Sequence, residues 1–64
     1  MNPMVIVYYA EGEWRWRMLG SGGRVMQSSQ RGFAYRDDAV TSACVENPGI
    51  PVEVDTFFSG LATG

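Results

Sequence analysis

The chain contains no histidine and no lysine, and Cys44 is the only cysteine among its 64 residues. An intrachain disulfide is therefore impossible, and a zinc site would have to combine Cys44 with carboxylates, which is not the usual ligand set of zinc. A nucleophile needs a base beside it, and without histidine that base would have to be a carboxylate or an amine. A single free cysteine is typical of a reducing compartment, so we expect a cytoplasmic protein.

The carboxylates and glycines offer little further chemistry. Asp37 and Asp38 are adjacent in a predicted helix, where neighbouring residues do not face each other. The helix dipole, which favours acidic residues in the first turn, explains them better. The stretch GSGG at residues 20–23 lacks the lysine of a phosphate-binding loop and fits a connection between strands. We therefore expect no enzymatic activity, no cofactor and no metal.

Long apolar runs are also missing from the chain. No stretch approaches the roughly 18 residues that a membrane-spanning helix needs, and the first ten residues lack the basic start of a signal peptide. The net charge of −2 opposes general nucleic-acid binding, which favours basic domains. We expect no membrane partner, and a single domain over residues 1–64 with an ordered core at about residues 4–57 and a loose tail at 58–64.

The shortness of the chain limits its core. A domain of this length buries only about 60% of the surface that its unfolded chain exposes. Such small domains usually depend on disulfides, a metal or a second subunit. The composition disfavours the first two, so we expect the chain to be stabilised as a homodimer.

Alternating and apolar stretches predict four strands and one helix. The strands are expected at residues 4–10, 14–19, 24–30 and 50–57, and the helix at residues 36–46. The connections between the first three strands are too short for a parallel crossover, so these strands should form an antiparallel meander. The expected fold is α+β, a β(3)-α-β unit in which one helix packs on one face of an antiparallel sheet.

A narrow apolar stripe runs along the predicted helix and consists of Ala39, Val40, Ala43 and Cys44. Because Cys44 belongs to this stripe, we expect it to be buried as a small hydrophobic residue. No serine, threonine, asparagine or aspartate stands where the helix should begin, near Ala34 or Tyr35, so no side-chain cap is expected there.

The segment GEWRWR at residues 12–17 interleaves two tryptophans with two arginines. On a strand, successive side chains point to opposite faces, so Trp14 and Trp16 share one face while Arg15 and Arg17 share the other. The small residues of the helix stripe need large side chains opposite them to fill the layer. We therefore expect the tryptophans to face the helix and the arginines to lie on the open face of the sheet.

The open face is the predicted partner-binding surface. Arginine and aromatic residues are enriched at protein interfaces, and the candidates on this surface are Arg15, Arg17, Leu19, Tyr8 and Tyr9. Glu53 and Asp55 have the parity to lie on the same face, where they could form cross-strand ion pairs with the arginines. An acidic protein partner is the alternative match for the arginines.

Two motifs resemble those of the YegP-like family. The first is EWRWRM at residues 13–18, and the second is GRVMQSS at residues 23–29, at the spacing found in that family. An aromatic residue, Phe33, then precedes a helix with small residues, Ala39 and Ala43, as it does in the family. The resemblance covers roughly residues 4–54, but this helix is acidic and uncapped, unlike that of many members.

The resemblance implies a β(3)-α-β unit that joins a second unit in one continuous sheet by exchanging the last strand. For this single unit, it implies a homodimer whose interface residues are Ile50, Val52, Val54, Thr56 and Phe57. The family has no established general activity, so the resemblance assigns no catalytic or ligand-binding residue.

Together these observations favour a small, non-enzymatic, homodimeric protein-interaction module. Concrete forms would be an accessory protein, or an inhibitor of a host protein encoded by a phage or mobile element. Two alternatives stay open. One is nucleic-acid binding through the arginine-bearing face, and the other is small-molecule binding in a groove of the dimer, lined by Tyr8, Tyr9, Phe33 or Tyr35.

Overall fold

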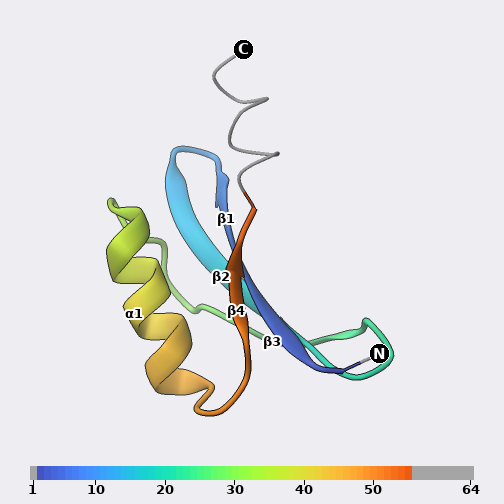
Figure 1. The fold of residues 1–64 in the computed structure, drawn as a ribbon. Helices are drawn as coiled ribbons and strands as arrows, with labels where there is room; N and C mark the ends of the chain where they lie inside the picture. Colours follow the sequence, from blue (N-terminus) through green and yellow to red (C-terminus); the bar gives the residue numbers. More distant parts are fainter. Residues whose placement is uncertain (1, 56–64) are drawn as a thin grey trace.

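The computed structural model describes residues 2–55, which form a four-stranded sheet with one helix packed on one of its faces (Figure 1). In chain order the elements are β1 (Met4–Ala10), β2 (Glu13–Leu19), β3 (Val25–Ser28), α1 (Arg36–Glu46) and β4 (Val52–Val54). The predicted α+β class and the order of three strands, a helix and a last strand are confirmed. Thr56, Phe57 and the predicted loose tail at residues 58–64 lie outside the described residues.

The first three strands form the predicted antiparallel meander. The spatial order of the sheet is β3-β2-β1-β4, and β1 and β2 pair along their whole length. Glu11 and Gly12 connect them with φ angles of 56° and 83°. Two successive residues in the left-handed region are typical of the type I′ hairpin turn, whose twist matches that of the strands.

β3 is shorter than the predicted strand at residues 24–30, and all four of its side chains are exposed. Its ladder with β2 shifts register between Met18 and Leu19. Ser29 then ends the regular pairing. Its N–H donates to the Trp16 carbonyl at 2.9 Å, and its Oγ accepts a hydrogen bond from the Trp16 N–H at 3.2 Å. The Ser29 hydroxyl thus accepts the hydrogen bond of the Trp16 N–H, which a backbone carbonyl would accept in a regular ladder.

β4 corrects the prediction of a wholly antiparallel sheet. It pairs in parallel with β1 in its own chain, because β3, α1 and β4 form a helical crossover that returns the chain in its original direction. The strand is also shorter than residues 50–57: Pro51, which has no N–H, lies just before it. The Pro51 carbonyl still accepts from the Val5 N–H at 2.8 Å, and the Asp55 N–H donates to the Val7 carbonyl at 2.7 Å. Exchange of this strand with a second copy stays a prediction.

The core lies between the sheet and α1. Its buried side chains are Val5, Val7, Trp16, Ala39 and Ala43. The two alanines let the helix approach closely enough for the Trp16 indole to fill the layer, and the indole Nε1–H donates to Ser42 Oγ at 3.0 Å. Partly buried residues complete this cluster: Trp14, Met18, Phe33, Val40, Ile50, Val52 and Val54. The prediction that the tryptophans face the helix is confirmed, with Trp16 more deeply buried than Trp14.

The predicted burial of Cys44 is wrong. Its side chain is exposed, because the helix contacts the sheet along Ala39, Ala43 and Asn47, and Cys44 lies about 100° further around the axis from Ala43. Asn47 ends the helix and is only 4% exposed. Its Nδ2 donates to the Ala43 carbonyl at 2.9 Å, and its backbone N–H donates to the same carbonyl at 3.0 Å.

The start of α1 has no side-chain cap, as predicted. Tyr35 occupies the N-cap position in extended backbone conformation and makes no capping hydrogen bond. Asp37 and Asp38 lie in the first turn, where the helix dipole favours them. Within the described part of the chain, no helix is long and apolar enough to cross a membrane.

Candidate functional site

The face of the sheet opposite α1 is the candidate site, because no helix or strand among residues 2–55 covers it (Figure 1). Because successive side chains of a strand point to opposite faces, the side chains that do not face α1 lie on this open face. Those of β1 are Met4, Ile6, Tyr8 and Ala10, and all four are only partly buried. An apolar column therefore runs along β1 in the middle of the open face.

Charged columns flank this apolar column on both sides. Ile6 pairs with Arg17 of β2 on one side and with Glu53 of β4 on the other. In the next row, Tyr8 pairs with Arg15. The parallel register that pairs Val7 with Val54 places Asp55 on the other side of Tyr8. These two rows across β2, β1 and β4 thus read basic, apolar, acidic, whereas Met4 pairs with Leu19 and Ala10 with Glu13.

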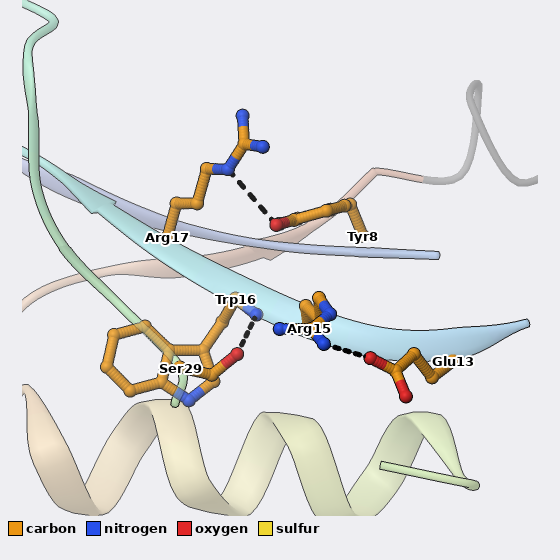
Figure 2. Close-up of polar contacts among 6 residues, drawn as sticks. All are labelled: Tyr8, Glu13, Arg15, Trp16, Arg17 and Ser29. Atoms are coloured by element: carbon orange, nitrogen blue, oxygen red, sulfur yellow. Dashed lines mark hydrogen bonds and ion pairs between the residues drawn. The ribbon is translucent and has the colours of Figure 1, made fainter. Parts of the chain in front are cut away.

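Arg17 is held upright on the open face by Tyr8. Its Nε–H donates to the Tyr8 hydroxyl at 3.1 Å, and its Cζ lies 4.7 Å from the centroid of the Tyr8 ring. Figure 2 shows both side chains on the side of the sheet away from α1, with the terminal nitrogens of Arg17 pointing outward. A cation–π contact at an exposed site contributes about 0.5–1 kcal/mol, so this contact orders the guanidinium without burying it.

Arg15 differs from Arg17 because it already has an anionic partner. Its guanidinium forms an ion pair with the Glu13 carboxylate on the same strand, and both side chains are 37% exposed. The charge of Arg15, one of the two arginines on the open face, is thus neutralised within β2. Arg17 has no carboxylate partner among residues 2–55, which leaves it as the cation of the open face that can pair with another molecule.

A hollow of about 330 Å³ lies over the apolar column. Its lining is largely apolar, and consists of Ile6, Tyr8, Ala10, Arg17, Leu19 and Asp55. The hollow is large enough to receive a side chain from another protein. It therefore joins the apolar column and Arg17 in one surface.

The structure brings four of the five predicted partner-binding residues onto this face, namely Arg15, Arg17, Leu19 and Tyr8. Tyr9 lies on the opposite face, where its ring meets Trp14 edge to face at a centroid distance of 5.2 Å. The sequence analysis did not include Ile6 and Ala10 among the candidates for this face. Ile6 lies between the apolar residues Val5 and Val7. This alternation along the strand could have placed Ile6 and Ala10 on the open face.

Of the cross-strand ion pairs that were possible between the arginines and the acidic residues of the last strand, the one between Arg17 and Glu53 does not form among residues 2–55. The two residues share a row, but Ile6 and the whole of β1 lie between them. Residues two strands apart are separated by about 9.6 Å, and the Arg17 guanidinium is directed to Tyr8 instead of reaching across β1. Glu53 is exposed at the opposite side of the apolar column.

A second depression lies between α1 and the segment at residues 27–33. It has a volume of about 450 Å³, with Trp16 and Ser42 among its lining residues. Arg31 lies over the Phe33 ring at its rim, with 4.6 Å from Cζ to the ring centroid. The four aromatic residues proposed for a ligand groove do not converge on it in one chain: Phe33 lines this depression, Tyr35 a separate shallow one, and Tyr8 and Tyr9 opposite faces of the sheet.

No cluster of metal ligands is present in the part of the chain that the structure describes. Among these residues, no three histidine, cysteine, aspartate or glutamate side chains gather closely enough to hold an ion.

Comparison of the chain with protein-family models, curated proteins and solved structures found no significant match. The resemblance to the YegP-like family therefore rests on the two motifs and their spacing alone.

Proposed function

We propose that this chain is a small, non-enzymatic, homodimeric protein-interaction module that uses the open face of its sheet as its contact surface. The observation that carries the proposal is the apolar column of β1, which lies uncovered by any described element between a basic and an acidic column. A contiguous apolar patch rimmed by polar residues is typical of a protein-binding surface.

The composition of the open face favours a protein over a nucleic acid. Single-stranded nucleic acids bind to aromatic residues within a positively charged groove. Here both tryptophans lie on the helix side of the sheet, and Glu53 and Asp55 lie in the same rows as the arginines. A polyanion on this face would meet acidic residues, whereas a protein surface with both signs of charge would match it.

Nucleic-acid binding through the arginine face remains the alternative function, supported by the stacking of Arg17 on Tyr8. Its test is a mobility-shift titration with single-stranded DNA and RNA at low salt. Binding that weakens steeply as salt is raised would support it. No shift at low salt would remove it.

The homodimer is supported by the small core and by the YegP-like motifs. Exchange of β4 is the geometry that the resemblance implies. Val52 and Val54 pack against the core of their own chain here, and an identical strand from a second copy could make the same contacts. Exchange would leave the residues of the open face unchanged.

Site-specific photo-crosslinking tests the contact surface. Tyr8 and Tyr35 are each replaced by benzoylphenylalanine in separate variants. Tyr8 lies on the open face, whereas Tyr35 is 70% exposed at the start of α1 and serves as the matched control. We expect discrete protein adducts from position 8 and none from position 35. An absence of adducts at position 8, or the same adducts from both positions, would contradict the proposal.

A further inference from the structure

The open face carries a pattern of charge that is complementary to itself. Across β2, β1 and β4, one row reads Arg17, Ile6, Glu53 and the next reads Arg15, Tyr8, Asp55. In these two rows, the basic residues lie on the β2 side of the apolar column and the acidic residues on the β4 side, although Glu13 of β2 neutralises Arg15. A surface of this kind can bind a second copy of itself if the two faces are turned so that opposite charges meet.

Symmetry decides which arrangement does this. A two-fold axis parallel to β1, in the plane between two facing sheets, places β1 on β1 and β2 of each copy opposite β4 of the other. A two-fold axis perpendicular to the strands places β2 on β2, so that arginines face arginines. An interface between identical copies repeats every contact twice, so only the first axis forms two pairs of opposite charge.

We infer that a second copy of this chain docks on the open face, with the strands of the two sheets aligned and Arg17 of each copy opposite Glu53 of the other. Ile6 and Tyr8 of the two copies pack at the centre. The inference rests on the proposed function, and it names the partner that occupies the contact surface. Aligned face-to-face packing, with sheets about 10 Å apart, is a common arrangement of two sheets.

The side chains that this arrangement requires are available. The contact with Tyr8 uses only Nε of Arg17, so both terminal nitrogens remain for a carboxylate, the geometry that makes an arginine–carboxylate pair strong. Glu53 is exposed and lies in the row of Arg17. The hollow of about 330 Å³ beside Tyr8 can receive apolar side chains of the second copy.

The dimensions of the chain set an upper limit on the area of this interface. The two longer dimensions of the chain are 32 and 21 Å, which bound one face at about 670 Å² and the surface buried on both copies at about 1,300 Å². Stable protein interfaces begin at about 1,200 Å². The interface is therefore small, and the charge pairs should contribute visibly to its affinity.

Charge reversal tests the inference in the full chain. Arg17→Glu and Glu53→Arg are each expected to raise the dimer dissociation constant at least about tenfold, because each places like charges opposite each other twice. The double variant R17E/E53R should form dimers again. An equimolar mixture of the two single variants should also form a heterodimer, since each position 17 then faces an opposite charge. Sedimentation equilibrium at micromolar concentrations measures all four states.

Matched control variants reverse the same charges on α1. Arg36→Glu and Glu46→Arg change the net charge as the test variants do, and both side chains are exposed on the other side of the molecule. They should leave the dimer dissociation constant within about twofold of the unaltered chain. Far-UV circular dichroism reports whether each variant is folded.

Each failure has a distinct meaning. A monomeric unaltered chain overturns the inference, while crosslinks from position 8 to another protein would still support a contact surface. A dimer that persists in every variant also overturns it, and points to association elsewhere, such as strand exchange. Should Arg17→Glu fail to fold, Glu53→Arg alone decides, because the Glu53 side chain is exposed and makes no hydrogen bond or ion pair among residues 2–55. A folded Glu53→Arg variant that dimerises normally would overturn the inference.

Discussion

At the scale of single residues, Trp16 and Arg17 are neighbours on β2 that lie on opposite faces of the sheet, one buried against α1 and the other exposed. The period of a strand is two, so placing Trp16 inside fixes Arg17 outside without knowledge of any partner. The apolar stripe of the helix contains two neighbouring columns, one with Ala39 and Ala43 and the other with Val40 and Cys44. Nothing in the sequence indicated whether the contact with the sheet would include Cys44, or Asn47 at the end of the first column. A polar residue that is buried because it caps the end of the helix cannot be found from hydrophobicity alone.

Trp16 is the residue whose removal should cost the most stability. Trp16→Ala is expected to lower the free energy of unfolding by about 3–5 kcal/mol, since it leaves a cavity between the sheet and α1. Trp14→Ala, which removes a half-buried indole nearer the edge of the core, serves as the comparison and should cost clearly less. Urea denaturation followed by circular dichroism measures both. Equal losses would show that the core is not centred on Trp16.

Exposure of Cys44 gives a second test at this scale. Iodoacetamide should alkylate the thiol in the folded protein at a rate within a few-fold of that in urea. Cys44→Ser should change the free energy of unfolding by no more than about 0.5 kcal/mol. Ala43→Val is the matched contrast, because its extra methyl groups enter a packed layer and should cost about 1–3 kcal/mol. Protection of the thiol from alkylation in the folded protein would show that Cys44 is buried.

At the scale of elements, the sequence predicts which segments become strands and helix, but not how the last strand runs. Short turns dictate that β1, β2 and β3 are antiparallel. The direction of β4 depends on where α1 crosses the sheet, which is a property of tertiary packing. The length of β3 was overestimated for another reason: the Ser29 hydroxyl accepts from Trp16, a contact that propensities do not contain.

The uncapped start of α1 can be improved. Tyr35 has the extended conformation of an N-cap residue, with φ of −121° and ψ of 141°, and no capping hydrogen bond. Tyr35→Ser should therefore raise the free energy of unfolding by about 1 kcal/mol, because the serine Oγ can accept from a free N–H of the first turn. Ala34→Ser, one residue earlier, should give no such gain. A midpoint of thermal unfolding that does not rise for Tyr35→Ser would contradict this assignment.

At the scale of the whole molecule, α1 covers one face of the sheet, and no helix or strand among residues 2–55 covers the other. The short length, with one cysteine and no histidine, predicts that a second subunit stabilises the chain. The surface that would contact a second subunit could be identified only from the register of the sheet. The pairing of Ile6 with both Arg17 and Glu53 reveals the rows with opposite charges at their two ends.

The self-association that we infer through the open face would couple folding to protein concentration. The midpoint of thermal unfolding should rise as the protein is concentrated, since a partner that binds only the folded chain stabilises it by mass action. Ile6→Gln should abolish this rise and leave a folded monomer, because Ile6 is at the centre of the open face and is only partly buried. The adjacent Val7→Gln serves as the contrast. Val7 is fully buried in the core, so an unpaired amide there should unfold the chain at every concentration. If Ile6→Gln retains the concentration dependence, the chain associates through another surface.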